Sequence, residues 1–302
     1  MVSVNQQPMD FWGDEQFSFF ESVLFSVLGH PVEVIETQFL AGGDINTAAQ
    51  VFSSEGVYFI KWNHADQLTD MFDMEAKGLN LLRQTDTMTI PDVIGCGRHQ
   101  DKSYLVLSHV DSGKIGDGYW ETLGQSLAEI HSHTQPQFGL SFNNYIGSLP
   151  QNNQPNPNGL AFFFDQRLLP QAGMAFYNEL LSKPVYESLL RLRDRLPDLL
   201  PAERPALLHG DLWSGNVMIT EAGSPALIDP AVYYGFREAD LAHTRLFGGF
   251  DSRFYDAYNE AFPLEAGFEA RVPIYNLYPL LVHVNLFGSG YVSGVERILK
   301  PF

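Results

Sequence analysis

The stretch from residue 208 to 241 limits the possible folds of this chain most strongly, because it holds two short apolar runs that each end in an acid. The run Leu207-Leu208 leads through His209 to Asp211, and the run ALI leads directly to Asp229. Between them, Asn216 precedes a third apolar run, VMI, and the turn-forming sequence EAGS. Short apolar runs separated by turn residues predict strands. The stretch therefore predicts a hairpin with two carboxylates and a carboxamide at its base.

The spacing of these polar residues is typical of a kinase. Kinase catalytic loops place an Asp that accepts the proton of the attacking hydroxyl, then an Asn metal ligand after four intervening residues, and a metal-binding Asp further on. Asp211, Asn216 and Asp229 have this order and spacing. Either acid alone fits a strand end or a turn cap, but the set together favours catalysis. We predict that Asp211 is the catalytic acid-base residue, and that Asn216 and Asp229 bind Mg²⁺, which prefers oxygen ligands.

A second group of candidates lies among three strands predicted over residues 32–39, 48–52 and 57–62. Gly42 and Gly43 separate the first two strands, and Lys61 lies in the third. Glycines let backbone N–H groups approach phosphates closely, and kinases hold the phosphates with a lysine on this third strand. Without further context, a hairpin turn is the better interpretation of the glycines, and a solvated strand position is the better interpretation of the lysine.

The following helix, predicted over residues 69–84, supplies that context. Its apolar stripe contains Phe72, Ala76 and Leu79, and Glu75 lies within the same stripe. A buried carboxylate is costly unless it is paired with a positive charge. We therefore predict an ion pair between Glu75 and Lys61.

Two more strands, over residues 91–98 and 103–108, complete a predicted five-stranded antiparallel sheet. The pattern breaks just after them, which predicts a hinge where the backbone of Ser108 and Val110 binds adenine. The predicted domains are an N-lobe over residues 1–109 and a C-lobe over residues 110–302.

The C-lobe is predicted to be mainly helical. His131 lies on the inner stripe of its first helix and is read as a core histidine with satisfied hydrogen bonds, while the Asn- and Pro-rich residues 135–159 are read as an excursion within the lobe. Helices are predicted over residues 11–28, 119–134, 162–171, 174–181, 185–196, 241–247, 252–261, 266–283 and 291–299.

The sequence HGDLWSGN, followed by IDPAVYYGFREADLA, resembles the fructosamine kinase (ketosamine 3-kinase) family, a branch of the kinase-like phosphotransferases that includes aminoglycoside and choline kinases. The segments EAKGL and NYIGSLPQ also resemble that family's pattern, although residues 159–162 lack a Trp that the family commonly has there. The resemblance implies a bilobal protein-kinase-like α+β fold, ATP and Mg²⁺ as cofactors, and phosphorylation of the 3-hydroxyl of a ketosamine such as a fructosamine or ribulosamine adduct. We further predict that Trp213 forms a wall of the sugar pocket, with packing beneath the loop as the alternative.

Three other functions would use part of this residue pattern. A kinase for aminoglycosides, choline or another small hydroxyl substrate is the alternative enzyme. A protein kinase would need an activation segment after Asp229, and the chain continues almost at once into YYG and a helix. A nucleotide-binding pseudokinase is disfavoured because the full set is present: Lys61, Glu75, Asp211, Asn216 and Asp229.

The amino-acid composition argues against several classes of binding partner. The net charge of −18 disfavours nucleic acid and anionic membranes, which attract basic surfaces. The chain has no apolar run of about 18 residues, and its single cysteine, Cys96, excludes an internal disulfide and fits a reducing cytoplasm. We expect a cytoplasmic monomer or weak homodimer whose partner is a small glycated amine.

Overall fold

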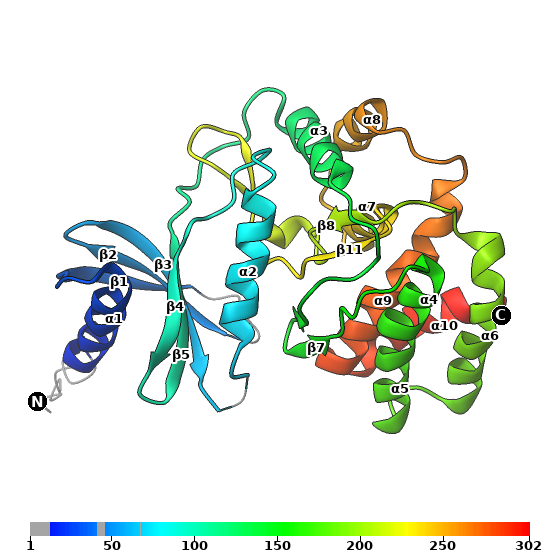
Figure 1. The fold of residues 1–302 in the computed structure, drawn as a ribbon, viewed down its shortest axis with the longest axis horizontal. Coiled ribbons are helices and arrows are strands. Elements are labelled where there is room, and N and C mark those ends of the chain that lie inside the picture. Colours follow the sequence, from blue (N-terminus) through cyan, green and yellow to red (C-terminus); the bar gives the residue numbers. More distant parts are fainter. Residues whose placement is uncertain (1–12, 41–45, 67) are drawn as a thin grey trace, which may run out of the picture. The chain divides into compact units, whose positions relative to one another are not determined.

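The computed structural model describes residues 13–40, 46–66 and 68–302 of the chain (Figure 1). These residues form two compact units. One unit holds the described residues up to Ala76 together with Pro91–His109, and the other holds Lys77–Ile90 together with Val110–Phe302.

The first unit is built on a five-stranded antiparallel sheet with the strand order β1-β2-β3-β5-β4 (Figure 1). Burial alternates along β2, where Ala49 and Val51 are fully buried, as expected for a strand with one face on a core. The predicted five-stranded sheet is confirmed. Its strands are β1 (Val34–Leu40), β2 (Thr47–Ser53), β3 (Gly56–His64), β4 (Val93–His99) and β5 (Lys102–Ser108).

Helix α1 (Gly13–Leu28) covers the core of this sheet. Phe20, Val23 and Leu24 recur at helical spacing, and all three are buried in one cluster with Ile60 and Val106 of the sheet. The helix predicted over residues 11–28 is therefore present, although its first two residues lie outside the described part of the chain.

Helix α2 (Met71–Arg83) buries the apolar stripe that its sequence predicted, including Phe72 and Leu79. Its second half and the loop that follows belong to the second unit, whereas the sequence placed all of residues 1–109 in the N-lobe. The physical reason is local packing. The backbone of Gly78 lies against Val232, and the Leu227 N–H donates a hydrogen bond to Thr89 O at 3.0 Å.

The second unit is mainly helical. Helix α9 (Phe268–Phe287) neighbours α5, α7 and α10, and most of its residues are buried. The remaining helices of this unit are α3 (Tyr119–Ser132), α4 (Gly159–Phe163), α5 (Leu169–Tyr177), α6 (Lys183–Leu199), α7 (Glu238–Leu246), α8 (Ser252–Ala261) and α10 (Val292–Leu299).

One helical prediction was wrong. The sequence predicted separate helices over 162–171 and 174–181, but a single helical run covers α4, the π-helical turn Phe164–Leu168 and α5. Pro170 has no N–H to donate to Gln166 O, so a regular α-helix would leave that carbonyl without its usual partner. Here the Leu169 N–H donates to Phe164 O, and Arg167 Nη1 donates to Gln166 O at 3.1 Å. The widened turn thus accommodates the proline without ending the helix.

The excursion over residues 135–159 contains a small hairpin, β6 (Asn144–Ile146) paired with β7 (Leu149–Gln151). Its buried amides bind the backbone that follows Asp229. Asn144 Nδ2 donates to Val232 O at 2.8 Å, and Gln151 Nε2 donates to Ala231 O at 3.1 Å. The excursion therefore helps to fix the loop that carries one of the predicted metal ligands.

Among the helices that the structure describes, none combines the length and the apolar character needed to cross a lipid bilayer.

Candidate active site

Two pairs of antiparallel strands position the polar residues of the predicted hairpin. β9 (Val217–Ile219) pairs with β10 (Pro225–Leu227), while β8 (Ala206–Leu208) pairs with β11 (Tyr233–Gly235). Asp211 lies in the connection from β8 to β9, and Asp229 lies in the connection from β10 to β11. The Ala231 N–H donates to His209 O at 2.9 Å and links the two connections. The predicted hairpin is confirmed, with both acids at the same end.

The backbone of both connections takes the left-handed conformation at one residue. Gly210 has φ +83°, and a Cβ at this position would collide with Ala231 O, so only glycine fits. Asp229 has φ +54°, a conformation that Asp adopts more readily than most residues. Backbone strain of this kind occurs often at functional sites.

A buried acid on α7 holds the first connection in place. Asp240 accepts hydrogen bonds from the His209 N–H at 2.7 Å and the Gly210 N–H at 2.9 Å, and it contacts His131 Nε2 at 3.3 Å. Burial alone would raise the pKa of Asp240, but its contacts with His131, with His209 and with the Gly210 N–H outweigh burial and lower it. His131 also bonds Tyr258 Oη at 2.8 Å, which confirms it as a core histidine with satisfied hydrogen bonds.

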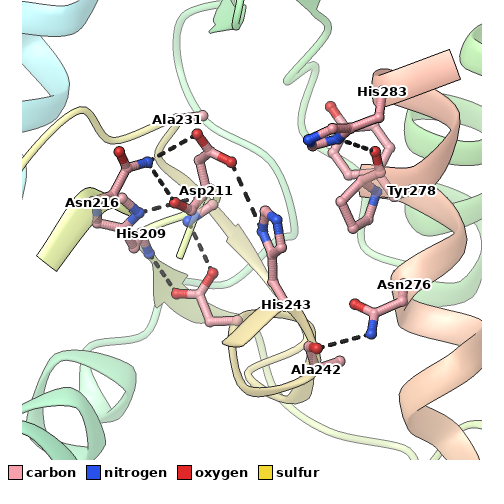
Figure 2. Close-up of polar contacts among 12 residues, drawn as sticks. His209, Asp211, Asn216, Ala231, Ala242, His243, Asn276, Tyr278 and His283 are labelled. Carbon is pink, nitrogen blue, oxygen red and sulfur yellow. Dashed lines mark hydrogen bonds and ion pairs between the residues drawn. The ribbon is translucent and has the colours of Figure 1, made fainter. Parts of the chain in front are cut away.

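The Asp211 carboxylate is held from one side by the predicted metal ligand Asn216. Asn216 Nδ2 donates to Asp211 Oδ2 at 3.0 Å and to Asp211 O at 2.8 Å (Figure 2). The carboxylate is about a quarter exposed, yet it is crowded by protein. Burial raises its pKa to about 7, the bond from Asn216 acts in the opposite direction, and the charges of Asp229 and Asp240 add to the rise. Such a carboxylate can accept a proton near neutral pH.

On its other side, Asp211 faces a histidine that the sequence did not single out. His243 Nδ1 lies 3.8 Å from Asp211 Oδ1 (Figure 2). Its side chain is only 5% exposed, and burial lowers the pKa of His243 to about 3, so the imidazole is neutral at physiological pH.

Asn216 and Asp229 offer a suitable donor set for Mg²⁺. Because Asn216 Nδ2 is bonded to Asp211, the amide oxygen Oδ1 is the atom that a cation can use. The Ile228 N–H donates to Asn216 O at 3.1 Å, which ties Asn216 to the residue before Asp229. Within the described residues, no cluster of three or more His, Cys, Asp or Glu side chains could hold a metal. Two protein oxygens, completed by phosphate oxygens and water, match the usual Mg²⁺ site of nucleotide enzymes.

The predicted ion pair in the first unit is present. Lys61 lies on β3, and its Nζ donates to Glu75 Oε1 on α2 at 2.8 Å. The two side chains are only 8% and 10% exposed, so each charge depends strongly on the other.

The structure describes two of the four residues that were predicted to contact the nucleotide through their backbone. Ser108 ends β5, and its N–H donates to Asp92 O at 2.9 Å, so a ligand at Ser108 would have to use the carbonyl oxygen. Val110 begins the second unit and is half-buried. Gly42 and Gly43 lie outside the described residues.

Trp213 lies in the catalytic loop with 38% of its surface exposed. Its ring covers the backbone of Gly215, where a Cβ would collide with it, and meets Phe247 edge-on with the ring centres 6.2 Å apart. Phe247 in turn contacts the rings of His243 and His283. This partial exposure favours a wall of a binding site over packing beneath the loop.

Sequence reasoning missed Asp240, His243 and these aromatic neighbours, because it read helix α7 as packing. One feature of the sequence could have identified Asp240 and His243. Asp240 and His243 are three residues apart on a helix and therefore share a face. Two polar side chains together on the buried face of a short helix are unusual unless they have partners.

Known proteins of one family are similar to this chain over nearly its whole length. A family model described as fructosamine kinase matches residues 17–302. A protein of Enterococcus faecium with the provisional name ketoamine kinase is 38% identical over 265 residues, which cover 87% of this chain and 94% of that protein. The chloroplastic protein-ribulosamine 3-kinase of Arabidopsis thaliana is 34% identical over 279 residues, covering 91% and 84% respectively.

Solved structures give the same result. A crystal structure from Thermobifida fusca, with the provisional name fructosamine-3-kinase, has a TM-score of 0.84 and 33% identity, and covers 93% of this chain and 96% of that one. An aminoglycoside phosphotransferase, APH(4)-Ia, has a TM-score of 0.59 at 17% identity, with 93% and 98% covered, a likeness of fold alone. The chain therefore belongs to the fructosamine kinase family of phosphotransferases, with their bilobal kinase-like α+β fold.

Proposed function

We propose that this protein transfers the γ-phosphoryl group of ATP to the 3-hydroxyl of a ketosamine. The observation that carries the proposal is the Asp211 carboxylate, which is bonded to Asn216 and lies in a loop linked to the loop of Asp229. This is the group that a kinase needs to receive the proton of an attacking hydroxyl.

Asp211 accepts a hydrogen bond from the 3-hydroxyl, aims its oxygen at the phosphorus, and takes the proton as the O–P bond forms. A pKa raised to about 7 makes this carboxylate a better base than an ordinary Asp. Asn216 and Asp229 would hold Mg²⁺, which neutralises charge on the phosphate oxygens and, as a cation, favours the ionised form of Asp211.

Lys61 pairs with the α- and β-phosphates, and Glu75 keeps its ammonium group in place. The Ser108 carbonyl and the Val110 N–H bind the adenine edge. Phosphate binding at Gly42 and Gly43, which lie outside the described residues, stays a prediction from the sequence. Positioning and electrostatics supply most of the rate in phosphoryl transfer, so each of these groups contributes without forming a covalent bond.

The sugar stacks on Trp213, whose exposed ring can cover the apolar face of a ketose beside Asp211. Two relatives support a ketosamine over an aminoglycoside or choline. They carry the names ketoamine kinase and protein-ribulosamine 3-kinase, and they match nearly the whole chain. We also propose that the protein acts in the cytoplasm as a monomer or weak homodimer, without nucleic acid or membrane as a partner.

The test is a substrate panel with purified protein and Mg²⁺-ATP. Fructosyl- and ribulosyl-amines, as free amino acids and as glycated peptides, are compared with an aminoglycoside and with choline by ADP release. Phosphorus NMR identifies the phosphorylated oxygen. We expect turnover on a ketosamine with the phosphate on O3. Turnover on the aminoglycoside or choline alone would replace the proposed substrate, and no turnover on any acceptor would leave the chain as a nucleotide-binding module.

Two variants test the site residues against a matched control. Asp211→Asn should lower turnover by ~10²–10⁴ with ATP binding retained, and Asp229→Ala should raise the Mg²⁺ concentration needed for activity. Asp194→Asn, which removes an exposed acid from α6, should behave as wild type. An unchanged Mg²⁺ titration for Asp229→Ala would rule out its metal role.

A further inference from the structure

His243 occupies a position on α7 that packing alone does not explain. Its Nε2 atom is buried and has no hydrogen-bond partner among the residues that the structure describes. A buried polar atom without a partner destabilises the folded state, whereas an apolar side chain of similar size would fill the same space without that cost. The other end of the ring, Nδ1, faces the catalytic carboxylate at 3.8 Å.

The position of His243 is fixed from several sides. The carbonyl of the preceding residue, Ala242, accepts a hydrogen bond from the buried Asn276 Nδ2 on α9 at 2.8 Å (Figure 2). The next residue, Thr244, bonds Leu241 O and Tyr255 Oη through its hydroxyl. These bonds hold the backbone of α7 in place on both sides of His243.

We propose that His243 is a positioning residue for the phosphoryl transfer: its neutral imidazole carries the proton on Nδ1 and directs that N–H at Asp211 Oδ1. Asn216 holds Oδ2 from the opposite side, so the two side chains together restrict rotation of the carboxylate. This inference rests on the proposed role of Asp211.

The neutral charge state of the His243 ring suits its role in positioning Asp211. Burial lowers the pKa of His243 to about 3, so the ring stays neutral while it faces an acid. A protonated imidazole would stabilise the Asp211 anion and weaken it as a base, whereas a neutral N–H orients the carboxylate with a smaller effect on its basicity.

The experiment compares three replacements of His243 with a control on the same helix. His243→Leu removes the ring nitrogens. His243→Asn keeps a donor near the position of Nδ1, and His243→Gln moves the amide towards the position of Nε2. The control, Thr244→Val, removes a buried hydroxyl whose partners are Leu241 O and Tyr255 Oη. For each variant we measure kcat, the KM of both substrates and Tm.

We expect His243→Leu to lower kcat by about 10- to 100-fold, the scale for a displaced reacting group, while both KM values stay nearly constant and Tm is unchanged or higher. His243→Asn should recover most of the lost kcat and His243→Gln should not. Thr244→Val should lower Tm and leave kcat unchanged.

Two results would overturn the inference: wild-type kcat in His243→Leu, or kcat and Tm falling together in all three replacements. If His243→Leu does not fold, the difference in kcat between His243→Asn and His243→Gln decides whether the inference holds. Asp211→Asn is assayed in parallel to separate the two proposals. If it stays active, the role of Asp211 fails and this inference with it, whereas an inactive Asp211→Asn beside a wild-type His243→Leu rejects His243 alone.

Discussion

Replacing Asp211 with Asn should inactivate the enzyme and also stabilise it. The pKa of Asp211 rises from its ordinary value of 3.8 to about 7 in the folded protein, chiefly through burial. The folded state therefore holds this proton more tightly than the unfolded chain, and ionising the carboxyl costs folding free energy. Asn has nearly the same shape and can still accept the bond from Asn216 Nδ2. Its NH₂ group then faces His243 Nδ1, which can accept when the neutral ring carries its proton on Nε2, so the main change is the loss of the charge.

The size of the effect follows from linkage between protonation and folding. No cost exists below about pH 4, where the carboxyl is protonated in both states. The cost grows between pH 4 and 7 and is complete above pH 7. The full difference corresponds to roughly 4 kcal/mol at pH 8 and roughly 2 kcal/mol at pH 5, as upper values for a group that is a quarter exposed.

The assay is differential scanning calorimetry of both proteins at pH 5 and pH 8. EDTA is present, because Mg²⁺ beside Asp211 would lower its pKa. Asp211→Asn should melt higher than wild type, with the larger gain at pH 8. A matched control is Asp240→Asn, because the pKa of Asp240 is lowered and its ionised form stabilises the fold above its ordinary pKa. That variant should melt lower at both pH values. An Asp211→Asn protein that melts below wild type, or gains equally at both pH values, would refute the reasoning.

Three further predictions concern the remaining site residues and the cysteine. Glu75→Gln removes the charge that Glu75 contributes beside the buried Lys61 ammonium, so the KM for ATP should rise about tenfold or more while the ketosamine KM changes little. An ATP KM equal to that of wild type would reject the pair's role. Trp213→Ala should raise the ketosamine KM, measured by kinetics. Its free energy of unfolding, measured by urea denaturation, should fall by well under the ~3–5 kcal/mol that truncating a buried aromatic costs. A loss of stability with unaltered sugar preference would reject the role of Trp213 as a pocket wall. Activity should be indifferent to mild oxidants and thiols, because Cys96 is the chain's one cysteine and its Sγ contacts Asp73; a reversible loss cured by thiol, absent in Cys96→Ser, would contradict this.

Features that depend on neighbouring residues were predictable from the sequence. Asp211 and Asn216 can meet because only four residues separate them, so a single tight loop brings them together, and the short strands around them follow from apolar runs between turn residues. The pairing of Lys61 with Glu75 was predictable for a different reason. A helical period showed that the acid would be buried, and burial requires a partner.

Tertiary structure alone decided which distant groups surround Asp211. Asp240 and His243 reach the catalytic loop only because α7 packs against α9 in one particular position. The grouping of residues 77–90 with the second unit, and the π-helical turn that absorbs Pro170, also depend on contacts between segments far apart in the chain. Local sequence patterns set the conformation of each segment and the side that it buries. The pKa of a buried carboxylate and the identity of its neighbours instead depend on the packing of every element around it, which no short stretch of sequence encodes.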